Sequence, residues 1–345
     1  MLWDEQVTVS SGVGYKNNVL LSPYNQRGSA FNIDGIDLMV MRVPVDGWQI
    51  VGSLIGDDTR YWQNVGTDRE DTFIGSVQIQ RMFSPGWQAG LEVRGLYEDE
   101  VLDISLDQGS PTTVLVEGFA LTVQPSLRKE LGESFWLKVE MPVSRWLLAA
   151  PMDDYWEFGP VATAGYNFGR QSDVTLSYGA TFQPHDTWVA LDQFGRIPLE
   201  NPQLLNIFQQ RTELAWHQYW DAHRRWRSST RAVLVWKEDN GSGYFNYFQY
   251  QLIEDIRWQT KDWKIQGSVQ LANEDYPVQK IGTKTHSSTT LSRAIWEVSL
   301  EAEHRLYRGV KGFARLQYDR CLSNEAESAG NYNATTISGG LRYEF

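Results

Sequence analysis

Two arrangements of carboxylates and histidine in the sequence could support hydrolysis, which needs a nucleophile or an activated water beside a base. Glu213 and His217 lie in a segment with the alternating pattern of a strand, so they share a face but stand roughly 13 Å apart. The doublets Asp57–Asp58 and Asp153–Asp154 lie near the ends of similar segments. A solvated rim that binds divalent ions explains these doublets more simply than paired catalytic carboxylates do.

Other reactive patterns are missing from the sequence. It contains no HExxH, GxSxG or P-loop motif, and its remaining histidines, His185, His223, His286 and His304, are scattered. The NGSG run at 240–243 has the composition of a turn rather than of a phosphate-binding loop. We therefore predict that the protein is not an enzyme and that it has neither a metal site nor a cofactor.

The composition limits the class of protein. The chain of 345 residues carries a net charge of −12, which disfavours nucleic acid as a partner because phosphate binding requires a basic surface. Its single cysteine, Cys321, excludes an internal disulfide, and no run of 18 or more apolar residues predicts a transmembrane helix. The opening MLWDEQ lacks the features of a signal peptide, so we expect a mature chain or an excised domain with an added Met1.

The dominant pattern is an alternation of apolar and polar residues over long segments. In the final TTISGGLRYEF, one face carries Ile337, Gly339, Leu341, Tyr343 and Phe345, and the other carries Thr336, Ser338, Gly340, Arg342 and Glu344. The same period recurs in VTVSSGVGY, WQAGLEVRGLY, FWLKVEMPV, VTLSYGATF, WKIQGSVQL and AIWEVSLEAEHRL. The 15 Trp, 16 Tyr and 14 Phe are many aromatics for a mean hydropathy of −0.43. A membrane β-barrel combines these properties, because only alternate residues of its strands meet lipid.

Short and long connections alternate between these segments. Seven short ones carry turn residues: VDG (45–47), SPG (84–86), GES (132–134), RQS (170–172), AHRR (222–225), KD (261–262) and RGVK (308–311). Eight longer polar ones cover 17–29, 62–70, 99–112, 147–155, 184–203, 238–243, 275–288 and 323–332. They separate sixteen predicted strands, at 6–16, 30–43, 47–61, 71–83, 86–98, 113–129, 134–146, 156–169, 172–184, 204–220, 225–237, 244–260, 262–274, 289–307, 311–322 and 333–345. Both termini are expected on the side of the short turns.

An even number of long alternating strands, joined in this way, resembles the Gram-negative outer-membrane β-barrels of porin type. The final strand, with Tyr343 and the terminal Phe345, is similar to the membrane-assembly signal of that family. The resemblance implies one domain over 1–345, an all-β transmembrane antiparallel up-and-down barrel in the cell outer membrane with both termini in the periplasm. It also implies outer-membrane lipid, lipopolysaccharide and the barrel-assembly machinery as partners, and either a homo-oligomer or a periplasmic partner. A soluble sandwich or propeller would alternate too, but with shorter strands.

If the apolar face of each strand meets lipid, the polar face lines the interior. An Arg or Lys on the lipid face near mid-bilayer costs about 2–4 kcal/mol, so strand charges are expected to point inward. The alternation assigns to the pore lining Glu92, Arg94, Lys138, Glu140, Arg211, Glu213, His217, Arg227, Arg231, Lys237, Arg257, Lys264, Glu297, Glu301, Glu303 and Arg315, with Asp255, Asp319, Arg342 and Glu344. Three charges of opposite parity, Arg81, Glu254 and Arg320, are expected near strand ends or at a bulge.

These features predict a channel for passive diffusion of ions and small hydrophilic solutes. A basic wall with Arg211, Arg227 and Arg231 is expected to set its selectivity against Glu297 and Glu301, with a mild net preference. The apolar loop at 184–203 is expected to fold into the lumen. The alternative is an export barrel that moves a polysaccharide or polypeptide with a periplasmic partner, because SGVGYKNNVLLSP is similar to first strands of such barrels. A structural anchor or receptor without an open lumen is a third interpretation.

Overall fold

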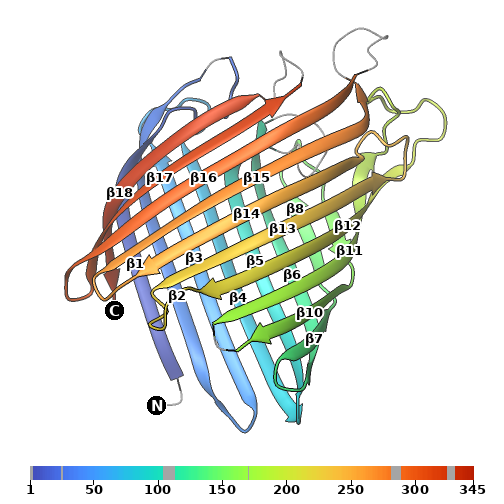
Figure 1. Cartoon of the computed structure of the whole chain (residues 1–345). Helices are drawn as coiled ribbons and strands as arrows, with labels where there is room; N and C mark the ends of the chain where they lie inside the picture. The colour runs from blue at the N-terminus through green and yellow to red at the C-terminus, as the bar shows by residue number, and fades with distance from the viewer. Residues whose placement is uncertain (1–2, 25, 104–112, 170, 281–288, 325–330) are drawn as a thin grey trace.

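The chain folds as one closed antiparallel sheet (Figure 1). The computed structural model describes residues 3–24, 26–103, 113–169, 171–280, 289–324 and 331–345. Its first and last strand segments pair with each other, from Thr8 opposite Glu344 to Lys16 opposite Thr336, which closes the barrel. Among the described residues, no helix is long and apolar enough to span a membrane.

Eighteen strand segments make up this sheet. They are β1 (Trp3–Lys16), β2 (Ser29–Val45), β3 (Trp48–Tyr61), β4 (Arg69–Ser84), β5 (Trp87–Asp103), β6 (Thr113–Leu131), β7 (Phe135–Glu140), β8 (Val143–Leu148), β9 (Tyr155–Phe158), β10 (Val161–Phe168), β11 (Ser172–Val189), β12 (Leu204–Tyr219), β13 (Trp226–Asp239), β14 (Tyr247–Gln259), β15 (Trp263–Lys280), β16 (Thr290–Tyr307), β17 (Val310–Ser323) and β18 (Tyr332–Glu344). When β7 with β8, and β9 with β10, are each taken as one strand, every strand pairs with its neighbours along the chain, which is up-and-down topology.

Two of the sixteen predicted strands are interrupted at prolines. β7 and β8 both pair with β6 and follow each other across Pro142, and β9 and β10 follow each other across Pro160. A proline has no N–H to donate to the ladder, so the regular pairing stops there. When each interrupted pair is counted as one strand, the barrel has sixteen strands, as the sequence predicted.

Several predicted strand ends were placed too early. β11 continues to Val189 and β15 to Lys280, so the connections expected at 184–203 and 275–288 begin later than predicted. Polar residues mark where a strand leaves an apolar environment, but a strand can go on pairing in water beyond that point. The parts of the long connections at 104–112, 281–288 and 325–330 lie outside the described residues.

The outer surface of the barrel is apolar. Residues directly opposite each other in paired antiparallel strands point to the same face, and Leu300, Leu316 and Ile337 form one such row. These side chains are 50%, 43% and 57% exposed. Large exposed apolar side chains around a closed barrel form a lipid-facing band.

Aromatic rows border this band at both ends. Trp226, Trp258 and Trp263 lie on the outer face beside the short turns. Phe73, Tyr97 and Phe119 are paired in a row on the outer face toward the long loops. Aromatic side chains favour the two membrane–water interfaces, so the rows mark the edges of the hydrocarbon layer.

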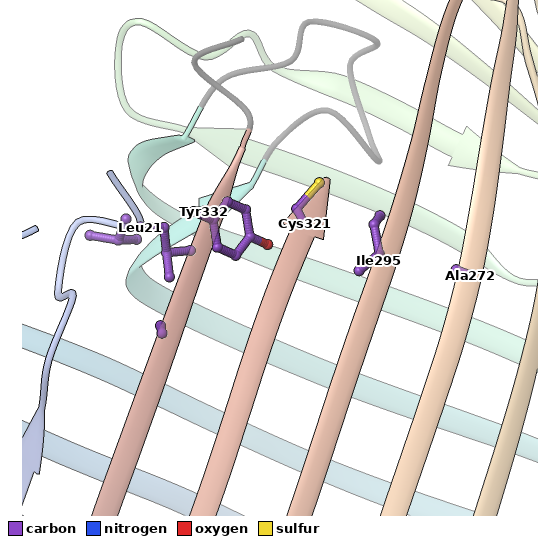
Figure 2. Packing of buried hydrophobic residues seen from close by; sticks show 7 residues of the cluster. Leu21, Ala272, Ile295, Cys321 and Tyr332 are labelled. Carbon is purple, nitrogen blue, oxygen red and sulfur yellow. The ribbon is translucent and has the colours of Figure 1, made fainter. Parts of the chain in front are cut away.

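Buried apolar side chains gather on the inner face toward the long-loop end. Ala272, Ile295, Cys321 and Tyr332 lie opposite one another across β15, β16, β17 and β18, and Leu21, from the connection after β1, belongs to the same cluster (Figure 2). Three further clusters lie toward the same end. Parts of the long connections therefore narrow the barrel at this mouth.

The apolar loop after β11 folds inward only at its base. Ala190 is buried with Leu205 and Ile207, which lie on the inner face of β12. The tip residues Phe194, Ile197 and Leu199 are exposed. The predicted insertion into the lumen is therefore wrong for the tip of the loop.

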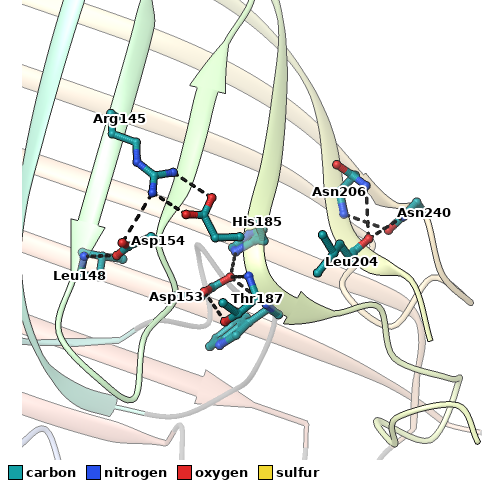
Figure 3. A network of polar contacts seen from close by, with 11 residues as sticks. Arg145, Leu148, Asp153, Asp154, His185, Thr187, Leu204, Asn206 and Asn240 are labelled. Atoms are coloured by element: carbon teal, nitrogen blue, oxygen red, sulfur yellow. Dashed lines mark hydrogen bonds and ion pairs between the residues drawn. The ribbon is translucent and has the colours of Figure 1, made fainter.

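The connection between β8 and β9 is tied to the end of β11 by Asp153 (Figure 3). Its Oδ1 accepts a hydrogen bond from the Thr187 hydroxyl at 2.7 Å, and its Oδ2 accepts from the backbone N–H groups of Thr187 at 3.1 Å and Trp188 at 2.9 Å. Burial by itself would raise the pKa of the Asp153 carboxyl, but these hydrogen bonds and the neighbouring His185 hold it below its ordinary value.

Replacing Asp153 with Asn is expected to weaken this tie by about 1–3 kcal/mol, because the amide offers one acceptor oxygen and no charge. The pKa of Asp153 is lower in the folded protein than in the unfolded chain, so its contribution is complete above the ordinary carboxyl range. That contribution is lost as the pH falls through the lowered pKa. Amide hydrogen exchange at Thr187 and Trp188 should be faster in Asp153→Asn at pH 7, and the difference from wild type should shrink in strong acid. An unchanged difference at low pH would contradict the ionised carboxylate.

The assignment of the two faces is tested by one adjacent pair in the middle of β17. Leu316→Arg puts a charge against lipid and should lower the free energy of unfolding by about 2–4 kcal/mol. Gln317→Arg puts the same charge on the inner face and should change it little. Denaturant titration of the barrel folded into lipid vesicles measures both. Equal costs for the two variants would mean that the faces are assigned incorrectly.

Candidate functional site

The strand register places every side chain that was predicted to line the pore on the inner face. The set is Glu92, Arg94, Lys138, Glu140, Arg211, Glu213, His217, Arg227, Arg231, Lys237, Arg257, Lys264, Glu297, Glu301, Glu303 and Arg315. Alternate positions on each strand carry the apolar side chains of the outer band. Among the described residues, two cavities along the inner face bring part of this set together.

The first cavity, of about 490 Å³, lies in the half of the barrel nearer the short turns and is called the basic cavity below. Its charged lining consists of Arg227, Arg257 and Arg315 with Asp255 and Glu301. Hydroxyl and amide side chains complete the polar wall: Ser229, Gln266, Ser268, Ser299 and Gln317. Cationic side chains therefore outnumber carboxylates here.

The second cavity, of about 450 Å³, lies toward the long loops and is called the acidic cavity below. Five carboxylates line it, Asp57, Glu70, Glu100, Glu297 and Asp319, against the cations of Lys16 and Arg315. Arg315 and Gln317 line both cavities, so the two spaces adjoin along the inner face of β17. The interior thus changes from acidic to basic between the long-loop end and the short-turn end.

Ion pairs neutralise most of the predicted basic wall. Arg211 Nη2 lies 2.7 Å from Glu213 Oε2, and Arg231 Nη2 lies 3.1 Å from Asp255 Oδ2. Arg227 instead lies directly opposite Arg257 across β13 and β14. Among the described residues, neither Arg227 nor Arg257 forms an ion pair. The predicted basic wall of Arg211, Arg227 and Arg231 did not include Arg257, which was predicted only as a pore-lining residue, because its place opposite Arg227 depends on the register.

The acidic wall is also partly neutralised. Glu301 accepts from Arg315 Nη2 and Arg342 Nη1, both at 2.8 Å, and Glu303 pairs with the same Arg342. Glu297 instead lies directly opposite another acid, Asp319. Of the three glutamates on β16, Glu297 is therefore the one that no described cation neutralises, and its charge acts in the acidic cavity.

A contact between β1 and β4 near the long-loop end was not predicted from the sequence. Lys16 Nζ on β1 lies 3.0 Å from Glu70 Oε1 on β4, and the Tyr61 hydroxyl donates to Glu70 Oε2 at 2.8 Å. The alternation along β1 already predicts that Lys16 points inward. Its partner Glu70 lies three strands away, so the sequence pattern alone does not identify the pair. The pair fixes one side of the acidic cavity.

The side chains considered for hydrolysis do not form a catalytic arrangement. Asp57 lies on the inner face and Asp58 on the outer face, as adjacent strand residues must. His217 Nδ1 lies 2.9 Å from Asp173 Oδ2, whereas Glu213 is paired with Arg211. Within the ranges that the structure describes, no three His, Cys, Asp or Glu side chains converge as metal ligands would.

The Asp153–Asp154 doublet holds the rim together. Asp154 accepts from the backbone N–H of Leu148 at 2.8 Å and lies 3.6 Å from Arg145. The Thr187 hydroxyl donates to Asp153 rather than to His185, so the imidazole does not activate it as a nucleophile.

The three charges of opposite parity lie on the outer face. The Arg81 guanidinium is 4.9 Å from the centre of the Trp48 ring near the end of β4, and Arg320 is 5.8 Å from that of Trp296 near the end of β17. Glu254 lies near the middle of β14, where its pairing with both neighbours is regular. The expected bulge is therefore wrong for Glu254, which accepts a hydrogen bond from the outward Thr230 hydroxyl instead.

Comparison with known proteins relates this geometry to solved barrels. No family model matches the chain, and no curated protein matches it. The anion-selective porin from Comamonas acidovorans is similar over 99% of both chains, with a TM-score of 0.52 at 9% identity. OprD from Pseudomonas aeruginosa is similar over 99% of this chain and 93% of its own, with a TM-score of 0.48 at 8% identity. A loop-deletion form of OmpT, an outer membrane protein of Vibrio cholerae, covers 99% of both chains, with a TM-score of 0.46 at 10% identity.

Identities this low establish the fold and nothing finer. The likeness to the Comamonas porin covers the whole barrel, and the sixteen strands close on themselves as an outer-membrane barrel requires. The protein therefore has the all-β, sixteen-stranded antiparallel barrel fold of outer-membrane porins.

Proposed function

We propose that the protein is an outer-membrane channel for the passive diffusion of ions and small hydrophilic solutes. The observation that carries this proposal is the pair of adjoining cavities inside the barrel, lined by polar and charged side chains of both signs. A sixteen-stranded barrel is wide enough for an aqueous path. The inner wall offers ions and polar solutes a hydrogen-bonding surface, while the outer wall faces lipid.

The uncompensated charges are the groups that would act on a passing ion. In a confined space the effective dielectric constant is below that of bulk water, so a unit charge several ångströms away contributes on the order of 1 kcal/mol or more. The acidic cavity attracts cations at the long-loop end. Arg227 and Arg257 repel cations in the basic cavity, nearer the short turns. Because the two cavities act in opposite directions, we expect a mild preference for cations.

The proposal includes an orientation and a set of partners. The short turns and both termini lie at the same end of the barrel, which we place in the periplasm (Figure 1). Outer-membrane lipid, lipopolysaccharide and the barrel-assembly machinery are the proposed partners, the last of them at Tyr343 and Phe345. No catalytic step is part of the proposed function.

Neutralising the opposed arginines tests the selectivity. Arg227→Gln together with Arg257→Gln should shift the reversal potential in planar bilayers under a salt gradient further toward that of a cation-selective pore, because the barrier to cations is removed. Arg42→Gln together with Arg81→Gln is the matched control, since both of these arginines lie on the outer face near the short turns. The control should leave the reversal potential unchanged.

Two results would count against this function. An open pore with the same reversal potential before and after the replacement of Arg227 and Arg257 would show that these residues do not line the path. A folded wild-type barrel without any conductance would exclude the channel and favour the export barrel or a closed receptor.

A further inference from the structure

A row of five carboxylates crosses the outer face of the barrel. Asp34 on β2 lies opposite Asp58 on β3, Asp58 opposite Asp71 on β4, Asp71 opposite Asp99 on β5, and Asp99 opposite Glu117 on β6. We call these five residues the acidic row. The Cβ atoms of directly opposed strand residues are about 4.5–5.5 Å apart, and like charges in such positions destabilise a sheet.

Two arginines compensate only part of this charge. Arg60 Nε lies 2.6 Å from Asp58 Oδ1, and Arg69 Nε lies 2.7 Å from Asp99 Oδ2. No ion pair forms at Asp34 or Glu117 among the residues that the structure describes, and both of these side chains are exposed. Asp34 and Glu117 thus have no cationic partner in the described part of the chain, and Asp71 has only two long ion pairs.

Asp71, at the centre of the row, is a buried carboxylate whose ion pairs are both long. Its side chain is only 8% exposed, and Arg60 and Arg69 approach its Oδ2 no closer than 3.7 and 3.8 Å. Its Oδ1 is buried and accepts no hydrogen bond. A buried carboxylate oxygen without a donor is costly unless another cation satisfies it.

The acidic row lies at the edge of the lipid-facing band. The next outward-facing residues toward the short turns on β4, β5 and β6 are Phe73, Tyr97 and Phe119, the aromatic row of the long-loop side. Aromatic rows of this kind sit at the membrane–water interface, so the acidic row lies just beyond the hydrocarbon in the polar layer. Small hydrated cations can reach it there.

We infer that the acidic row binds a divalent cation, Mg²⁺ or Ca²⁺, between Asp58 and Asp71. Both ions prefer oxygen ligands, and Mg²⁺ in particular is commonly held by one or two carboxylates and several waters. The described residues supply no third side-chain ligand at one point, so water completes the coordination. The ion offsets the repulsion along the row and supplies Asp71 Oδ1 with its missing partner.

This site is distinct from the channel. It lies on the opposite face of the wall from the cavities, and the inward Asp57 takes no part in it. The sequence suggested divalent ions at the Asp57–Asp58 doublet, whereas the register pairs Asp58 with Asp71 on the next strand. Metal binding here can be measured whether or not the lumen conducts.

The direct test is a Mn²⁺ titration of the full chain, folded in a phosphate-free nonionic detergent, followed by electron paramagnetic resonance. The wild type should bind Mn²⁺ saturably, with Mg²⁺ and Ca²⁺ as competitors. Asp71→Asn should weaken the binding by about tenfold or more, because the number of charged ligands sets the affinity for hard cations. Glu254→Gln, which removes an outer-face carboxylate outside the acidic row, should bind Mn²⁺ as the wild type does.

A second measurement separates a metal site from a merely structural role of Asp71. Without divalent ions, Asp71→Asn should resist heat at least as well as the wild type in the gel-shift assay of barrel unfolding, because the substitution removes repulsion. Added Ca²⁺ should raise the unfolding temperature of the wild type more than Na⁺ at equal ionic strength, and it should not raise that of Asp71→Asn. A wild type without saturable Mn²⁺ binding, or an Asp71→Asn variant with wild-type affinity, would overturn the inference.

Discussion

The closure of the hydrogen-bond ladder between β1 and β18 is the constraint on which the rest of the structure depends. Lipid offers no water to an unpaired backbone N–H or C=O, so a sheet survives there only without free edges. The seam runs from Thr8 opposite Glu344 to Lys16 opposite Thr336. At its centre Gly12 faces Gly340, where a Cβ on Gly340 would come within 2.2 Å of the Ser11 carbonyl oxygen. The glycines of the first and last strands therefore permit the close approach that closes the barrel.

The same requirement explains how the barrel tolerates prolines within strands. Pro125, Pro142 and Pro160 lie on three successive strands and cannot donate hydrogen bonds. Their carbonyl groups still accept them, from the backbone N–H groups of Met141 at 3.1 Å, Gly159 at 3.3 Å and Ala180 at 3.1 Å. The ladder is interrupted locally on the donor side, but neighbouring strands stay connected around it. A barrel wall can thus lose individual bonds without opening an edge.

Closure also separates two surfaces that obey different electrostatic rules. On the inner face, charges from neighbouring strands compensate one another, as Glu301 does with Arg315 and Arg342. Positions that face a like charge, such as Arg227 with Arg257 and Glu297 with Asp319, contribute to the electrostatic character of the lumen. On the outer face there is little charge within the hydrocarbon layer, and the acidic row lies beyond the aromatic row that marks its edge. On each surface, the net charge at a given position therefore depends on pairings between side chains of neighbouring strands.

The sequence by itself determined the architecture of this protein and the face of each strand residue. Alternation with period two separates Leu316 from Gln317 without any tertiary information, because lipid and water lie on opposite sides of every strand. The turn residues then marked the sixteen strands. The partners were decided only by the tertiary structure: Arg231 with Asp255, Arg227 opposite Arg257, and Asp58 opposite Asp71. Parity gives a residue's face but not its register against the next strand, and a shift of two residues keeps the face while replacing every partner. Register follows from closing the whole ladder at once, so no single segment of the sequence contains it.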